Sequence, residues 1–160
     1  MPERIDSASF LNLNALQLSH IRVSETCLAD EAGKGYFMAI RLFKCEKCGS
    51  MVLKLNAKGC SPSCCGEPMK EIEAGTTDAA REKHVPAVTV DGDTVTVQVG
   101  SVAHPMADVH YIQFIILETK CGFQYAELQP GQEPKAVFKA ADPVAAYEYC
   151  NLHGFWKADI

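Results

Sequence analysis

Two residues near the C-terminus, Cys150 and His153, bind transition metals well and are spaced so that both can reach one ion. The turn that carries them closes at Gly154, and apolar or aromatic residues on either side can anchor it in a core. A soft thiolate beside an imidazole is typical of sites for iron, copper or zinc. We interpret the pair as the end of a mononuclear iron site whose other ligands come from earlier in the chain.

Further histidines lie beside expected strand ends and turns in the same half of the chain: His84, His104 and His110. A lone histidine is more often a hydrogen-bonded core or surface residue than a metal ligand. Together with the first pair, however, these residues supply four imidazoles and one thiolate. An ion that prefers six ligands then keeps one position open for a substrate.

The N-terminal half has its own metal-binding residues, namely Cys45, Cys48, Cys64 and Cys65. A CxxCG turn, a hairpin and a second cysteine pair are typical of a metal knuckle, which has little apolar core and needs an ion to fold. Four thiolates suit tetrahedral zinc or iron. A structural zinc ribbon is the favoured alternative on spacing alone, but it normally ends in a second CxxC. The adjacent Cys64 and Cys65 reach one ion only with backbone strain.

Length and composition limit the possible classes of protein. The 160 residues allow one or two small domains. Eight cysteines without a secretory N-terminal pattern favour metal thiolates over disulfides and predict a cytoplasmic protein. No apolar run approaches the roughly 20 residues of a membrane helix. From residue 77 onward there are 11 acidic and 6 basic residues, which does not suit a nucleic-acid surface.

The chain divides into three expected parts: 1–37, 38–76 and 77–160. The first has no sustained period and is expected to be a weakly ordered extension, so we assign no metal or catalytic role to His20 or Cys27. The second contains the cysteine knuckle and two expected strands, at 39–43 and 51–55.

The sequence pattern of the third part, residues 77–160, predicts a mostly β fold. Valines alternate on both sides of Asp91-Gly92-Asp93, which is a strong hairpin signal. About seven short strands with frequent turns are typical of an antiparallel sandwich of immunoglobulin-like type. The expected strands cover residues 87–90, 94–99, 111–119, 123–128, 136–139, 147–150 and 155–158.

The segment from Phe43 to Met69 resembles desulforedoxin, a small protein with a distorted iron–tetrathiolate centre. Cys60 departs from that pattern, and we expect it to be a free thiol. Four later motifs resemble superoxide reductase: Glu82-Lys83-His84-Val85-Pro86, His104-Pro105-Met106, His110-Tyr111-Ile112 and Cys150-Asn151-Leu152-His153-Gly154. With the knuckle included, residues 43–159 resemble desulfoferrodoxin, the two-iron form of that enzyme.

This resemblance implies two iron ions per chain. One ion is expected to bind the four knuckle cysteines, and the other to bind His84, His104, His110 and His153 in a plane with Cys150 axial. Superoxide would bind at the vacant sixth position, take one electron and two protons, and leave as hydrogen peroxide. A rubredoxin-like electron donor and a homodimer are implied in the same way.

Two further residues of these motifs are expected to act at the open position. Lys83 would attract the anionic substrate, which the acidic C-terminal half otherwise repels. Glu82 is similar to the residue that ligates the oxidised ion. Cys121 is expected to be structural, and Tyr111 and Trp156 to pack around the iron site and limit water access.

Two other functions remain open on the sequence. One is a metal-binding electron carrier, which has no need of an open coordination position. The other is a structural zinc knuckle joined to a partner-binding sandwich, with incidental histidines. Iron content and colour separate both from the enzyme.

Overall fold

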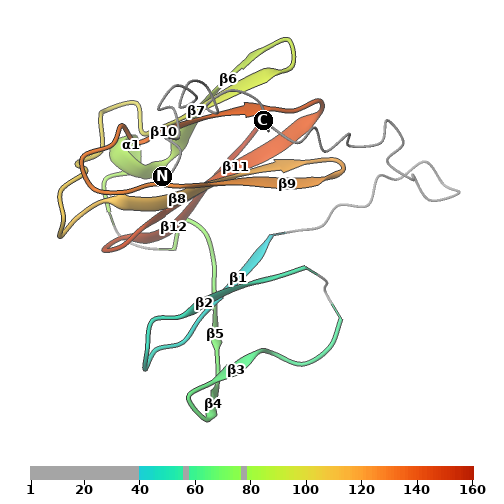
Figure 1. Cartoon of the computed structure of the whole chain (residues 1–160), viewed down its shortest axis with the longest axis vertical. Coiled ribbons are helices and arrows are strands. Elements are labelled where there is room, and N and C mark those ends of the chain that lie inside the picture. Colours follow the sequence, from blue (N-terminus) through green and yellow to red (C-terminus); the bar gives the residue numbers. More distant parts are fainter. Residues whose placement is uncertain (1–39, 56–57, 77–78) are drawn as a thin grey trace, which may run out of the picture.

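The computed structural model describes residues 40–55, 58–76 and 79–160. The predicted extension, residues 1–37, lies outside this range, as do His20 and Cys27. The regular secondary structure of the described part is almost entirely β, with one short helix (Figure 1). No helix within it is long and apolar enough to cross a membrane.

A small N-terminal unit carries the cysteine knuckle. Its three-stranded antiparallel sheet has the order β2-β1-β5, with β1 at Arg41–Lys44, β2 at Met51–Lys54 and β5 at Lys70–Ile72. A two-stranded hairpin of β3, Ser63–Cys64, and β4, Glu67–Pro68, projects from it (Figure 1). The short α1, Arg81–His84, then leads into the second part of the chain.

Two antiparallel sheets form a sandwich in that second part. The three-stranded sheet has the order β10-β7-β6, and the four-stranded sheet the order β12-β11-β8-β9. The strands are β6 at Pro86–Asp91, β7 at Thr94–Val99, β8 at Ile112–Thr119, β9 at Gly122–Glu127, β10 at Lys135–Lys139, β11 at Pro143–Cys150 and β12 at Gly154–Asp159.

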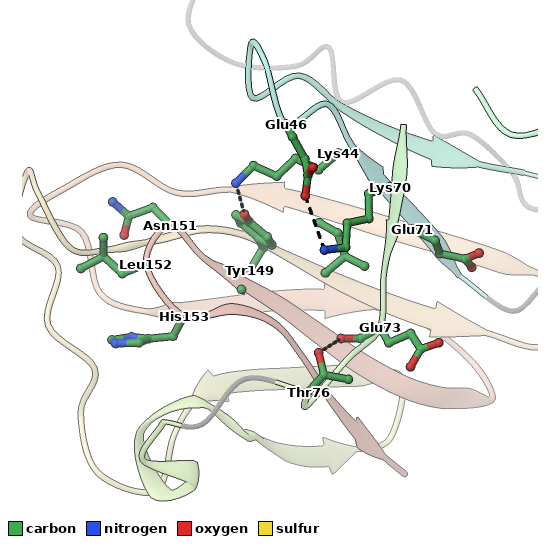
Figure 2. A pocket seen from close by; sticks show the side chains of 12 residues that line it. Lys44, Glu46, Lys70, Glu71, Glu73, Thr76, Tyr149, Asn151, Leu152 and His153 are labelled. Carbon is green, nitrogen blue, oxygen red and sulfur yellow. Dashed lines mark hydrogen bonds and ion pairs between the residues drawn. The ribbon is translucent and has the colours of Figure 1, made fainter. Parts of the chain in front are cut away.

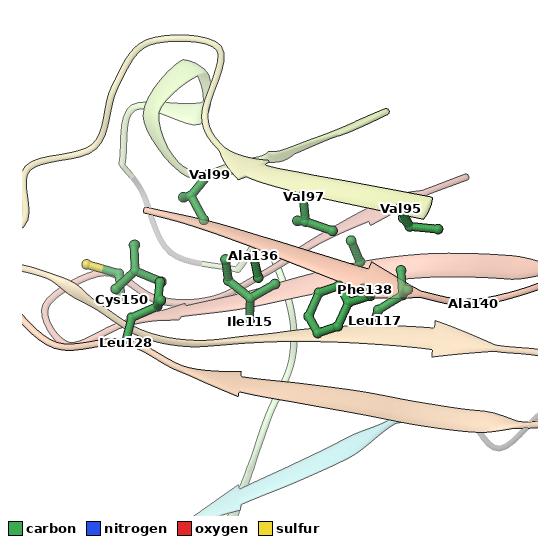
Figure 3. Close-up of a cluster of buried hydrophobic side chains, with 12 residues drawn as sticks. Val95, Val97, Val99, Ile115, Leu117, Leu128, Ala136, Phe138, Ala140 and Cys150 are labelled. Carbon is green, nitrogen blue, oxygen red and sulfur yellow. The ribbon is translucent and has the colours of Figure 1, made fainter. Parts of the chain in front are cut away.

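The core between the sheets follows from the period of two in the strands. Val95, Val97 and Val99 alternate with more exposed residues along β7 and are completely buried. They meet Ile115 and Leu117 of β8 across the sandwich (Figure 3). Cys150 lies at one end of this core and is completely buried, so packing within the sandwich fixes one candidate metal ligand (Figure 3).

The other face of the four-stranded sheet packs against the N-terminal unit. Tyr147 and Tyr149 of β11 point to this side and form a second apolar cluster with Leu42 of β1. Ile72 of β5 packs against the same cluster. The knuckle sheet therefore lies on the sandwich rather than standing apart from it.

The predicted mostly β architecture, with a cysteine knuckle and a seven-stranded antiparallel sandwich, is confirmed. The expected strand at 147–150 is longer in the structure, where β11 begins at Pro143. The sequence did not predict α1, β5 or the β3–β4 hairpin. These elements have only two to four residues each, too few to show a period.

Candidate metal centres

Five side chains from separate segments meet at one end of the sandwich. One ligand atom from each of them lies within 4.8 Å of all the others, and the five residues are His84, His104, His110, Cys150 and His153. They come from α1, the connection between β7 and β8, the end of β11 and the turn before β12. We call this set the five-donor group. The structure thus brings together all five residues that the sequence proposed for the second iron.

The four imidazole rings form a closed circuit. Successive ring centroids are 4.8 Å apart for His84 and His104, 4.6 Å for His104 and His110, and 4.8 Å for His110 and His153. His153 and His84, 4.7 Å apart, close the circuit. Each ring stands edge-on to the next, at interplanar angles from 74° to 78°. Four imidazoles in this arrangement surround a common centre.

The hydrogen bonds around the rings show that a cation fits this centre. The Nδ1 atoms of His84 and His104 lie 2.8 and 2.6 Å from the backbone carbonyls of Ala80 and Pro105. A carbonyl only accepts, so both Nδ1 atoms carry the proton and both Nε2 atoms keep a lone pair when the rings are neutral. These Nε2 atoms are 3.2 Å apart. Two lone pairs at that distance repel each other unless a proton or a metal ion lies between them.

Burial of the rings makes a metal ion between these nitrogens more favourable than a proton. It lowers the pKa of His104 to about 4 and also lowers the pKa values of His84 and His110. The Nε2 of His110 is buried and has no hydrogen-bond partner among the described residues. Neutral, inward-facing nitrogens of this kind are the form of histidine that binds metals.

Cys150 and His153, from the end of β11 and the turn before β12, complete the five-donor group. The Cys150 sulfur lies 3.5 Å from Nδ1 of His153, and the same nitrogen is 3.0 Å from Nε2 of His84. His153 therefore offers Nδ1 to the centre. Burial raises the pKa of the Cys150 thiol, so a cation is needed to hold it as a thiolate. The register between β11 and β8 shifts between Tyr149 and Cys150, which re-aims the strand where it enters the site.

Trp156 supports two members of the five-donor group. It is buried, and its ring stacks on His84 with 5.0 Å between centroids. Its Nε1 donates to the backbone carbonyl of His153 at 3.1 Å. The packing role expected for Trp156 is therefore observed. Tyr111 is half-buried, and its backbone is tied to the turn after Cys150.

The Glu82 and Lys83 side chains are exposed on α1, directly before His84. The carboxylate of Glu82 is not a member of the five-donor group. The charge of Lys83 adds to burial in lowering the pKa values of His84 and His110, so its field reaches both rings. The backbone of this segment is held by Val102, whose N–H donates to the carbonyl of Glu82 at 3.0 Å.

The four knuckle cysteines form a second group in the N-terminal unit. One sulfur from each of Cys45, Cys48, Cys64 and Cys65 lies within 4.8 Å of the others. We call this set the four-cysteine group. The first pair lies on a turn closed by hydrogen bonds from Cys45 N–H to the Ser50 carbonyl and from Gly49 N–H to the Cys45 carbonyl, each 2.9 Å. The sulfurs of Cys48 and Cys64 are 3.5 Å apart.

The adjacent cysteines carry the strain that their spacing predicts. Cys65 has a φ of +52°, a left-handed conformation that a side chain with a Cβ rarely adopts. This conformation turns two successive side chains toward one point, which an extended backbone does not do. Persistent strain of this kind usually marks a functional position.

Close contacts within the four-cysteine group also give its thiols different pKa values. Hydrogen bonding to Ser50 lowers the pKa of Cys48 to about 6, whereas hydrogen bonding to Cys48 raises the pKa of Cys64 to about 12. A full set of four thiolates at this spacing is stable only around a cation. The two groups together fit two iron ions per chain.

Two other cysteines and one acid complete the comparison with the sequence. Cys60 is an exposed free thiol outside both groups, as expected. Cys121, which we expected to be structural, also lies outside them and is disulfide-bonded. The sequence did not single out Glu148, which is completely buried two residues before Cys150. Burial raises the pKa of its carboxyl to about 9.

A cavity of about 600 Å³ lies between the N-terminal unit and the turn that carries His153. On one wall the ammonium of Lys44 donates to the hydroxyl of Tyr149 at 2.8 Å, and the ion pair of Lys70 and Glu46 lies beside it (Figure 2). Lys44 precedes Cys45, and Tyr149 precedes Cys150. This hydrogen bond therefore joins residues adjacent to the two metal groups.

Comparison with known proteins places these features in a family. Residues 76–159 match the family model described as desulfoferrodoxin. Desulfoferrodoxin of Nitratidesulfovibrio vulgaris is 49% identical over 120 residues, which cover 74% of this chain and 94% of that protein. A desulfoferrodoxin homolog of Archaeoglobus fulgidus is 45% identical, with 74% and 96% covered.

Solved structures agree with the sequence comparison. The crystal structure of the superoxide reductase from Treponema pallidum is 39% identical and aligns with a TM-score of 0.64, covering 76% of this chain and 99% of that one. With both cysteine and histidine groups in place, the chain belongs to the desulfoferrodoxin family.

Proposed function

We propose that this protein is a superoxide reductase, and that its reaction takes place at the five-donor group. The observation that carries the proposal is the closed circuit of four imidazole rings with the sulfur of Cys150 beside it. In this proposal the four-cysteine group binds the other iron, and the chain divides at about residue 76 into an iron-binding unit and the reductase sandwich.

The balanced reaction is the one-electron reduction of superoxide to hydrogen peroxide, with two protons consumed. The five donors would hold an iron ion, which would supply the electron, and a six-coordinate ion bound by five donors would leave one position for the substrate. Four neutral imidazoles and one thiolate leave a ferrous site with a charge of +1, which attracts an anion. The electron returns from an external donor, for which we propose a rubredoxin-like protein, and the proposed assembly is a homodimer.

The surrounding residues contribute attraction and exclusion of water. Residues 77–160 have an excess of acidic groups, so the overall field of this part opposes the approach of superoxide. Lys83 opposes this field locally, because its charge reaches His84 and His110. Trp156 stacks on the buried ring of His84 and so keeps water from that face of the ring.

Reaction stoichiometry tests the function directly. Purified protein should contain about two iron ions per chain and lose its colour on reduction. With excess external reductant, each superoxide should yield one hydrogen peroxide and no dioxygen. Dismutation would instead yield one peroxide and one dioxygen per two superoxide ions. A colourless protein that contains only zinc would rule out the enzyme.

Lys83→Ala tests the attraction of the substrate. We expect the second-order rate with superoxide to fall about tenfold or more, since local charge changes on-rates by 10- to 1000-fold, while the iron spectrum stays nearly the same. Lys120→Ala removes the same charge from the turn at the other end of β8 and is the matched control. An unchanged rate in Lys83→Ala excludes the role.

Glu82→Ala tests ligation of the oxidised ion. A carboxylate is a hard ligand that prefers ferric to ferrous iron, so Glu82 would approach the sixth position only after oxidation. The variant should change the ferric absorption at high pH and leave the rate of the ferrous protein almost unchanged. If the ferric spectrum stays the same at every pH, Glu82 is not a ligand.

A further inference from the structure

Asn151 lies between two members of the five-donor group, directly after Cys150 and two residues before His153. It begins the turn from β11 to β12, where Figure 2 shows its side chain beside Leu152 and His153. The residue is half-buried. Its amide reaches a segment of the chain that is distant in sequence.

The side-chain amide of Asn151 binds the backbone on both sides of His110. Its Oδ1 accepts the N–H of Tyr111 at 3.0 Å, and its Nδ2 donates to the carbonyl of Val109 at 3.0 Å. The Asn151 N–H also donates to the Tyr111 carbonyl at 3.2 Å. A backbone N–H only donates and a carbonyl only accepts, so these partners fix the orientation of the amide.

His110 needs this support more than its neighbours do. The rings of His84 and His104 are each oriented by a backbone carbonyl at Nδ1. The His110 ring makes no hydrogen bond within the described residues, and its inward Nε2 is buried. Its backbone is otherwise held by paired hydrogen bonds with Ala107, of 3.0 and 2.9 Å. The direction of the His110 ring therefore follows from how its backbone is held.

We propose that Asn151 is the positioning residue that holds His110 at the correct distance from Cys150 and His153. The amide of Asn151 joins the loop between β7 and β8 to the turn after β11. It therefore holds the ligands of both segments around one ion. The inference rests on the proposed iron site. Hydrogen-bonding partners outside the ligand shell typically change metal affinity by about 10- to 100-fold.

The test measures the transfer of ferrous iron from the iron-loaded full-length chain to a chelator. Iron left in the five-donor group is read from its absorption band after oxidation. Asn151→Ala should lose this iron at chelator concentrations about 10- to 100-fold lower. Asn151→Asp keeps the shape and the acceptor for Tyr111 but loses the donor to Val109, so we expect an intermediate loss. Leu152→Ala, on the same turn and 60% exposed, is the control and should match the unmodified protein.

A double-mutant cycle with His110→Ala separates positioning from general support of the turn. Without His110, Asn151→Ala should cause no further loss of iron, because the ligand that it positions is absent. An equal loss in both backgrounds overturns the proposal, and so does unchanged retention in both Asn151 variants. If His110→Ala itself retains iron normally, the proposed iron site fails, and the positioning role fails with it.

Discussion

The four-cysteine group lies on the turns of a small sheet, whereas the five-donor group lies at the end of a filled sandwich. Cys48 and Cys65 are exposed, and a small buried cluster of Phe43, Met69 and the ligand Cys45 lies beside them. At the other group the ligands Cys150, His84 and His104 are themselves buried. The first site thus depends on its ion for order, and the second on protein packing.

This difference indicates what each group is suited to do. Turns that an ion holds together provide four identical soft ligands and leave no position for a substrate. Donors placed by rigid strands and by hydrogen bonds from outside the ligand shell keep their geometry when the ion changes state or a ligand leaves. An open coordination position is therefore better maintained in the sandwich.

Removal of a knuckle ligand should have the largest effect. Cys64→Ser should lose the iron of the four-cysteine group and the amide hydrogen-exchange protection of residues 45–68, because metal binding supplies about 10 kcal/mol or more to folding in such small units. His110→Ala should weaken iron binding in the sandwich without loss of protection in β7 or β8. Hydrogen exchange read by mass spectrometry, together with iron content, measures both.

Cys60→Ser is the matched control for the knuckle variant, because Cys60 is a free thiol in the same unit but outside the group. It should retain both iron ions and all of its protection. Persistent protection of residues 45–68 in Cys64→Ser would show that packing on the sandwich, rather than the ion, orders the knuckle.

The ligands themselves were predictable because their chemistry is local. A CxxCG turn, an adjacent cysteine pair and a cysteine–histidine turn are visible as letters in the sequence. The positions that hold the ligands were not predictable in the same way. Asn151 acts on residues 40 and 42 positions earlier, and a buried acid such as Glu148 appears in the sequence as one polar residue in an apolar run. Only the fold shows which segments meet.

Gly100→Ala should have the next largest effect, and only on the sandwich site. Gly100 has a φ of +76°, and a Cβ there would lie 2.6 Å from the Lys83 carbonyl and 2.8 Å from the Glu82 carbonyl. We expect the variant to lower the free energy of unfolding by about 1–3 kcal/mol and to displace α1, which slows the reaction with superoxide. Chemical denaturation and the second-order rate measure these effects.

Gly92→Ala controls for the cost of the left-handed backbone. Gly92 has a φ of +59°, but a Cβ there meets nothing within 4 Å, so only the conformational cost of about 1 kcal/mol applies. Its rate with superoxide should be unchanged. Equal rates in the two variants would mean that the position of α1 does not matter for capture of the substrate.

Tyr149→Phe should have the smallest effect, and it tests whether the two groups are independent. The change removes the 2.8 Å hydrogen bond from Lys44 but keeps the contact of the ammonium with the ring, 5.5 Å from its centroid. One hydrogen bond contributes about 0.5–1.5 kcal/mol to stability. We expect a loss of this size with iron retention unchanged at both groups. Tyr147→Phe is the control, since that hydroxyl binds Glu118 within the sandwich. If Tyr149→Phe alone altered iron retention at either group, the two sites would be coupled through Lys44, and the knuckle would act on the sandwich site as well as bind its own ion.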